Sequence, residues 1–334
     1  MKFVYVLIST PNDYLGEKTI ISLFSLRRYH NNDYVEIYTD KNTVESIPET
    51  IQRLEALSAE IKIESIPSEL SQFQRSRFLK TSLRQRVKGD FVYLDLDTVI
   101  TGDLTELESI ECDMALALQH DCLDNNHEAS RNRLKRYNAS RKVKKDETYG
   151  IDEFFNSGVI LYRDTPTCRK ICEAWHSSWL ESSTKFGWNP DQTDLDRINA
   201  SFNRISILDG KYNCQLVGFR YAMTHLSDCK VIHYFNNPKL SYLKIKRPDY
   251  LSKIRETADY KMMENTINSL KSDYVKGLQI MENTQYDYLK KESDSGKKLE
   301  AFYTNPIRYP ISRLINKFPF LRKQVDLLKE KMHR

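Results

Sequence analysis

The stretch Phe91-Val92-Tyr93-Leu94-Asp95-Leu96-Asp97-Thr98-Val99 decides the fold. Its first half is β-branched and aromatic, which is typical of a buried strand, and two aspartates spaced i, i+2 follow. Residues two apart on an extended chain point to one side, so Asp95 and Asp97 are expected to converge at the carboxyl end of a strand. Two carboxylates this close repel each other. The pair therefore predicts a divalent cation with hard oxygen ligands, Mn²⁺ or Mg²⁺.

Strand and helix patterns alternate on both sides of this stretch. The expected strands are 2–9, 35–39, 61–63, 91–95, 113–118, 154–162, 205–208 and 230–234, and the expected helices are 16–28, 43–57, 76–87, 165–181 and 191–200. This rhythm predicts an α/β fold with a mostly parallel sheet flanked by helices. Residues 121–150 are polar and rich in Lys and Arg, so we expect a mobile loop or lid near the site.

Composition excludes several classes of protein. Of the 334 residues, 40% are hydrophobic and 29% are charged, as in a soluble globular protein, and no apolar run approaches the length of a membrane span. The apolar start at residues 3–8 precedes no cleavage site, so we expect it to be the first core strand. Six scattered cysteines argue against a disulfide framework, and we expect a cytoplasmic location.

Three further motifs follow the aspartate pair in order. They are Phe155-Asn156-Ser157-Gly158-Val159, Asn189-Pro190-Asp191-Gln192 and Val231-Ile232-His233-Tyr234. Together the four motifs resemble those of the nucleotide-sugar glycosyltransferases of the GT-A fold, most closely the retaining glycosyltransferase family 8. The resemblance covers about residues 2–240. It implies a GT-A-like catalytic domain at residues 1–244 that moves a hexose from a nucleotide sugar, UDP-linked, to a saccharide or lipid-linked saccharide acceptor.

The same resemblance assigns roles to individual residues. It implies that Asp95, Asp97 and His233 hold Mn²⁺ or Mg²⁺. The residues that it places at the donor are Thr10, Asp40, Arg77, Lys80, Asp95, Asn156, Ser157 and Lys239. The family has a glycine where this chain has Asn236, and Pro238 precedes the lysine here, so the chain departs from the family pattern around Lys239.

Two residues of the third motif are the catalytic candidates. Asp191 resembles the residue that orients a sugar hydroxyl, and Gln192 stands where retaining members place a polar group beside the anomeric carbon. A glutamine is a poor nucleophile. The expected mechanism is therefore a front-face attack, in which the acceptor hydroxyl approaches on the side from which the diphosphate leaves.

Two other functions stay open at this stage. Asp95-Leu96-Asp97-Thr98-Val99 also matches the signature of the haloacid dehalogenase phosphatases, in which the first aspartate is a nucleophile. That signature normally follows the first strand of its domain, whereas several strand–helix units precede it here. The other alternative is a non-catalytic relative that binds sugar. The oligomeric state is not predicted.

The C-terminal part of the chain has a different charge balance. Residues 301–334 hold eight Lys and Arg against Asp326 and Glu330, although the whole chain has a net charge of only +5. The basic character belongs to this tail, so a nucleic-acid surface is not expected. We expect residues 245–334 to form a helical, basic extension. Its amphipathic residues 308–334 either pack on the domain or contact an anionic membrane at its inner face.

Overall fold

The protein is built on a seven-stranded mixed sheet. The computed structural model describes residues 1–119, 128–141, 154–216, 219–235 and 240–281. The strand order of the large sheet is β3-β2-β1-β4-β7-β6-β8. These strands are β3 (Ala59–Glu64), β2 (Tyr34–Asp40), β1 (Lys2–Val6), β4 (Phe91–Leu94), β7 (Phe155–Tyr162), β6 (Met114–Leu118) and β8 (Ile205–Ile207). Only β7 runs antiparallel to its neighbours.

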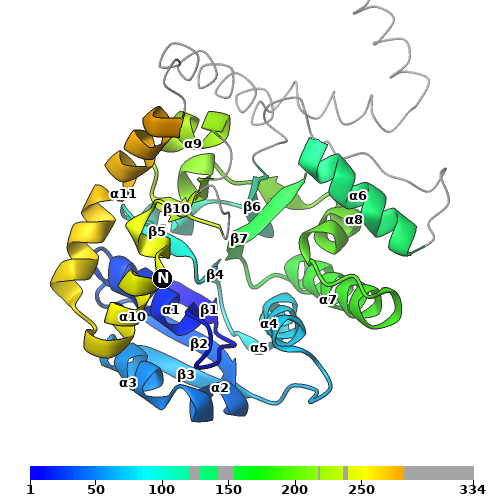
Figure 1. Ribbon diagram of the computed structural model, residues 1–334. Coiled ribbons are helices and arrows are strands. Elements are labelled where there is room, and N and C mark those ends of the chain that lie inside the picture. The colour runs from blue at the N-terminus through cyan, green and yellow to red at the C-terminus, as the bar shows by residue number, and fades with distance from the viewer. Residues whose placement is uncertain (120–127, 142–153, 217–218, 236–239, 282–334) are drawn as a thin grey trace, which may run out of the picture.

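The central strands β1, β4, β7 and β6 are buried on both faces because they are apolar at most positions. Along β1, Phe3 and Tyr5 belong to one hydrophobic cluster, whereas Val4 and Val6 belong to a second cluster on the opposite face. Side chains that alternate in this way need helices on both sides. Helices α1 (Leu15–Arg27) and α3 (Pro48–Ala56) cover the first face, and α4 (Gln72–Thr81), α5 (Leu83–Arg86), α7 (Pro166–Phe186) and α8 (Gln192–Phe202) cover the second (Figure 1). The expected fold class is confirmed.

A second, three-stranded sheet was not predicted. Its order is β5 (Thr98–Ile100), β10 (Val231–His233) and β9 (Cys214–Gln215). Three residues separate the end of β4 from the start of β5, which pairs antiparallel with β10 so that His233 lies opposite Thr98. The chain therefore leaves the large sheet at Asp95 and enters the small one at Thr98.

Several element boundaries differ from the sequence expectation. The helix expected at 43–57 is two helices, α2 (Lys41–Ser46) and α3, because Pro48 starts a new helix and lacks the N–H that would continue the old one. Helix α4 begins before residue 76 because Ser71 and Gln74 form a capping box. Residues 128–140, expected within a loop, form α6 (Glu128–Ser140), whose Leu134 and Tyr137 are buried.

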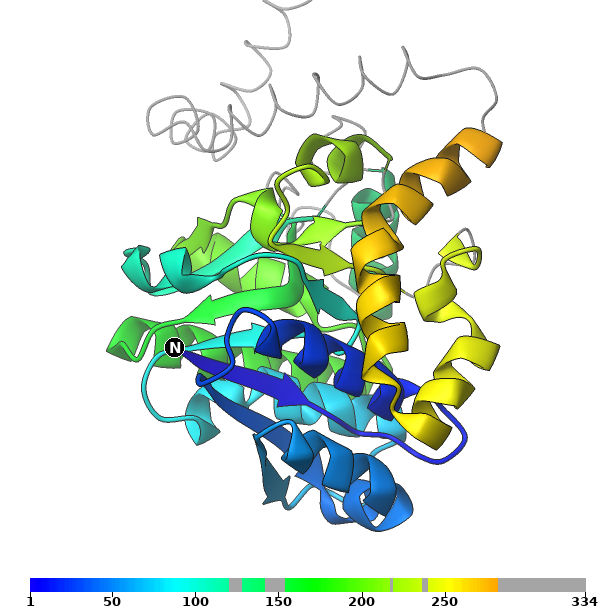
Figure 2. The same ribbon diagram turned by 90° about the vertical axis from the view of Figure 1, so that its left-hand side faces the viewer.

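Helices at the end of the described chain pack into the same core. Helix α10 (Pro248–Thr257) and helix α11 (Tyr260–Met281) lie beside α1, and α9 (Phe219–His225) is near β9 (Figures 1 and 2). Ile254 and Met263 belong to the hydrophobic cluster that contains α1. Arg53 donates hydrogen bonds to the carbonyl oxygens of Ile254, at 2.9 Å, and Glu256, at 3.1 Å. These contacts satisfy carbonyls at the carboxyl end of α10.

The tail from residue 282 onward, with its amphipathic residues 308–334, lies outside the described residues. Every helix within them is too short or too polar to span a bilayer.

We predict that α10 unfolds together with the sheet. Ile254→Ala should lower the free energy of unfolding by about 2–5 kcal/mol, because it opens a cavity in a shared core. Its exposed neighbour Lys253 is the control, and Lys253→Ala should change that free energy by less than about 0.5 kcal/mol. Urea denaturation followed by tryptophan fluorescence measures both. If the urea midpoint of Ile254→Ala equals that of the wild type, α10 is not part of the core.

Candidate active site

The two aspartates lie in a turn that joins the two sheets. The expectation of an extended chain from Asp95 to Asp97 is wrong, because β4 ends at Leu94 and residues 95–97 turn before β5. The N–H of Asp95 still donates to the Gly158 carbonyl, at 2.8 Å, and the Thr98 hydroxyl closes the turn on the Asp95 carbonyl, at 2.7 Å. The turn brings the two carboxylates together by a different route from the one the spacing suggested.

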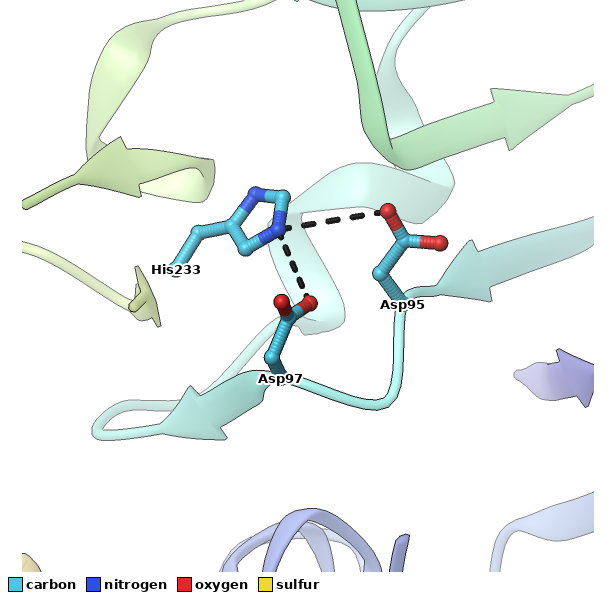
Figure 3. Close-up of side chains that lie close together, drawn as sticks. All are labelled: Asp95, Asp97 and His233. Atoms are coloured by element: carbon cyan, nitrogen blue, oxygen red, sulfur yellow. Dashed lines mark hydrogen bonds and ion pairs between the residues drawn. The ribbon is translucent and has the colours of Figure 1, made fainter. Parts of the chain in front are cut away.

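His233 meets both aspartates at this turn. Its Nε2 lies 3.1 Å from an Asp97 oxygen and 3.9 Å from an Asp95 oxygen (Figure 3). One potential ligand atom from each of the three residues lies within 4.8 Å of the others. Burial opposes ionisation of Asp97, but the His233 imidazole overrides it and lowers the pKa of that carboxyl. The expected convergence of the three side chains is thus present.

A third carboxylate, Asp191, is buried beside this cluster and paired with cations. The Arg77 Nε lies 3.1 Å from one oxygen of Asp191 and the Lys80 Nζ lies 3.7 Å from the other. Burial raises the pKa of Asp191, but Lys80 and then Arg77 lower it below its usual value. Ser157 also donates a hydrogen bond to Asp191, at 2.9 Å. Asp191 is therefore held as a carboxylate.

Lys80 connects the two acidic groups. Its ammonium is almost fully buried and donates to both oxygens of Asp95, at 3.0 and 3.2 Å, as well as lying near Asp191. The Tyr93 hydroxyl donates to Asp95 too, and burial followed by the Asp95 charge raises the pKa of that phenol. The side-chain positions of Arg77 and Lys80 on one face of α4, expected from their i, i+3 spacing, account for these contacts.

A row of hydrogen-bonded side-chain amides extends the site as far as Gln192. Asn156 and Gln192 both donate to the Gln119 amide oxygen, each at 3.1 Å. Gln192 also donates to the Phe155 carbonyl at 2.9 Å, and its own amide oxygen accepts from Arg133 of α6 at 2.8 Å. The catalytic candidate Gln192 is therefore fixed in one orientation by three protein partners.

The aspartates, their cationic partners, His233, Asn156 and Gln192 border one cavity of about 530 Å³ at the carboxyl edge of the central strands. Its described wall holds nine of the residues singled out from the sequence, namely Arg77, Lys80, Asp95, Asp97, Asn156, Ser157, Asp191, Gln192 and His233. The structure thus brings together residues that are up to 156 positions apart in the chain, the separation of Arg77 from His233. A cavity of this size suits a small-molecule substrate.

The comparison with known proteins now decides the family. The model of glycosyl transferase family 8 matches residues 12–240. The chain belongs to glycosyl transferase family 8. It is a glycosyltransferase, and the phosphatase alternative is not favoured. A search of the curated proteins finds no match.

Solved structures with a similar architecture include three glycosyltransferases. The galactosyltransferase LgtC, solved with donor and acceptor sugar analogs, is 14% identical over 81% of this chain and 96% of its own, with a TM-score of 0.47. Mouse xyloside xylosyltransferase 1 is 15% identical over 71% of this chain and 99% of its own, with a TM-score of 0.46. GlyE of Streptococcus pneumoniae TIGR4 is 17% identical over 79% of this chain and 63% of its own, with a TM-score of 0.48.

Three of the donor residues expected in this family 8 enzyme are not among the described residues that line the cavity. Thr10 hydrogen-bonds to Asp13 through its N–H, at 3.0 Å, and its hydroxyl, at 3.1 Å. Asp40 caps α2 by accepting from the Thr43 N–H, at 2.8 Å, and forms an ion pair with Arg75. Their role at a nucleobase stays a prediction. Lys239 lies outside the described residues.

Sequence reasoning missed two lysines near the cavity. Lys18, in the first turn of α1, lines it, and its charge helps to lower the pKa of Asp97. Within the described ranges, the Lys18 ammonium makes no hydrogen bond or ion pair. Burial, and then repulsion from Lys18, lowers the pKa of Lys246 to about 8. Lys18 could have been found from the sequence, because it is a basic residue near the start of the helix that follows the first strand, where anions often bind.

The packing around His233 leads to a prediction about Gly158. A Cβ at position 158 would lie 2.0 Å from the His233 Cε1, so Gly158→Ala must displace the ring. We expect glycosyl transfer to fall by about 10- to 100-fold, the size of effect known for residues that orient a metal ligand. Steady-state turnover measures the change.

The matched control is Gly89→Ala, where φ is +74° and a Cβ would meet nothing within 4 Å. The left-handed backbone should lower its stability by about 1 kcal/mol. Its turnover should be that of the wild type. Equal activities for the two variants would show that Gly158 does not position His233.

Proposed function

We propose that this glycosyltransferase moves a hexose from a UDP-linked nucleotide sugar to a saccharide or lipid-linked saccharide acceptor. The anomeric configuration of the hexose is retained. The observation that carries the proposal is the convergence of Asp95, Asp97 and His233 on the wall of the cavity. Family membership supplies the reaction class. The side chains that line the cavity support the more specific parts of the proposal, namely the metal, the donor and the mechanism.

The side chains of Asp95, Asp97 and His233 fit a divalent ion. Two carboxylates and one imidazole suit Mn²⁺, and the oxygen ligands also suit Mg²⁺. Without positive charge between them, two carboxylates this close to each other would repel. When bound, the ion would supply positive charge to the departing diphosphate of the donor.

The donor diphosphate would lie near the start of α1. Lys18 offers an ammonium there, and the first turn of a helix presents backbone N–H groups and the positive end of its dipole to an anion. Lys80 and Arg77 are already paired with Asp95 and Asp191, so they compensate protein carboxylates. Lys239 is the second expected contact to the diphosphate.

The charges of the wall favour a mechanism without a covalent enzyme intermediate. The carboxylates of the described wall are Asp95, Asp97 and Asp191. The first two belong to the metal cluster, and ion pairing stabilises the charge of Asp191, which weakens it as a nucleophile. Gln192 is a neutral amide. We therefore infer that the acceptor hydroxyl attacks on the face from which the diphosphate leaves, while Asp191 orients a sugar hydroxyl directly or through Arg77.

The proposed class of acceptor is inferred from the sequence of residues 308–334. This basic, amphipathic sequence agrees with a lipid-linked acceptor at an anionic membrane surface. Packing of residues 308–334 on the domain remains the alternative. Binding of the full-length protein to vesicles with and without anionic lipid separates the two.

Removal of the metal or of one ligand tests the proposed function. A panel of UDP- and GDP-sugars should give turnover with Mn²⁺ or Mg²⁺ and none after chelation by EDTA. Asp97→Ala should lower turnover by more than about 100-fold, beyond the effect of outer partners of a metal ligand. The control is Asp103→Ala, since Asp103 is exposed and outside the cavity wall.

Metal-independent transfer that survives Asp97→Ala would refute the proposal. Phosphate release from a phosphoester without any sugar acceptor would instead favour the phosphatase alternative, with Asp95 as its nucleophile.

Lys18→Ala tests the diphosphate contact. We expect KM for the donor to rise by about tenfold, since a hydrogen bond to a charged group contributes about 1.5–3 kcal/mol and a partly exposed one lies at the lower end. The KM for the acceptor should not change. The control is Lys41→Ala, because Lys41 is exposed on α2. An unchanged donor KM would exclude Lys18 from the diphosphate site.

A further inference from the structure

Asn213 is a buried residue that no motif contains, and it contacts the metal candidate His233. It lies between the 3₁₀ helix Gly210–Tyr212 and β9, with none of its surface exposed. Its side-chain oxygen lies 3.0 Å from the His233 Nδ1. Its side-chain nitrogen donates to the Asn156 oxygen at 2.8 Å. Both ends of the amide are therefore in use.

The orientation of these amides follows from one backbone group. The Gly158 N–H can only donate, and it lies 2.9 Å from Asn156, so the atom of Asn156 that it meets must be the oxygen. That same oxygen requires a donor from Asn213, which places the nitrogen of Asn213 there and its oxygen toward His233. An amide oxygen can only accept. The Nδ1 of His233 must therefore carry a proton.

A proton on Nδ1 decides what the other ring nitrogen can do. In the neutral imidazole, Nε2 then holds a lone pair, and it faces the oxygens of Asp97, at 3.1 Å, and Asp95, at 3.9 Å. A lone pair directed at two anionic oxygens is repulsive, so in this arrangement Nε2 takes either a second proton or a cation. A cation shared by the three atoms displaces that proton and turns the repulsion into attraction.

We propose that Asn213 is a positioning residue for a divalent cation. Anchored through Asn156 to the Gly158 N–H, it holds the proton of His233 on Nδ1 and keeps Nε2 directed at the two aspartates. Metal-binding histidines commonly donate their second N–H to such a partner, which fixes the ring and its tautomer. The inference rests on the metal-dependent function proposed above and adds Asn213 to its machinery.

Packing is the competing explanation for the ring position. The Phe235 ring centroid lies 4.0 Å from that of His233, and the ring is so close to Gly158 that a Cβ there would lie 2.0 Å from Cε1. If packing alone orients His233, the hydrogen bond from Nδ1 to Asn213 is dispensable. A variant that keeps an accepting oxygen at position 213, compared with one that removes it, separates the two explanations.

The experiment measures Mn²⁺ affinity of the full chain without any donor, from the electron paramagnetic resonance signal of free Mn²⁺. Asn213→Ala should weaken binding about 10- to 100-fold, whereas Asn213→Asp keeps the acceptor for Nδ1 but loses the donor to Asn156, so it should weaken binding less than Asn213→Ala does. Asn199→Ala is the matched control. Asn199 is also almost fully buried, but its side-chain oxygen accepts the backbone N–H groups of Arg204 and Ile205, just after the end of α8.

The measured affinities separate a positioning role of Asn213 from simple packing around His233. Wild-type affinity in Asn213→Ala would overturn the inference, as would an equal loss in Asn213→Asp, since packing or stability would then explain both. Circular dichroism melting checks the fold. If Asn213→Ala does not fold, Asn213→Leu, which fills the space without an acceptor, must show the same loss. A wild type that binds no Mn²⁺ would instead refute the metal in the proposed function.

Discussion

The site depends on the compensation of three carboxylates that share one cavity. Unit charges 4 Å apart interact by about 4 kcal/mol at an effective dielectric constant of 20, so Asp95, Asp97 and Asp191 could not stay ionised together without cations. Lys80 reaches Asp95 and Asp191, and Arg77 reaches Asp191. Asp97 faces the His233 Nε2, and the cation proposed between these residues would compensate its charge.

This charge balance explains the architecture around it. The cations Arg77 and Lys80 come from α4, which covers one face of the large sheet, whereas His233 comes from the small sheet. The turn at residues 95–97 is the place where the chain passes from one sheet to the other. Asp95 and Asp97, which lie in that turn, therefore meet groups from α4 and from the small sheet. Family membership makes the protein a glycosyltransferase, and the cavity at this edge is the proposed place of transfer.

The sequence predicted the parts of this site that carry a dense local signal. The central strands are apolar, four motifs stand in order, and Arg77 and Lys80 have helical spacing. The strand expected at 230–234 is present as β10, but β5 and β9 have only three and two residues, too few for a periodic pattern, so the small sheet was not predicted. Asn213 belongs to no motif, because its role depends on hydrogen bonds to residues distant in sequence. Aspartate is favoured at helix N-caps, and Asp40 directly precedes α2 and accepts the Thr43 N–H. The sequence therefore already indicated a structural role for Asp40.

The separation of the ligands along the chain has a consequence for biosynthesis. The contact between Asp97 and His233 spans 136 residues, and β5 has its partner β10 at a similar distance. Contacts this remote in sequence form late in folding. A nascent polypeptide therefore carries the acidic turn without its imidazole until β10 has left the ribosome. The proposed cation site is therefore incomplete while the first two hundred residues are being translated, and it forms only when β10 pairs with β5.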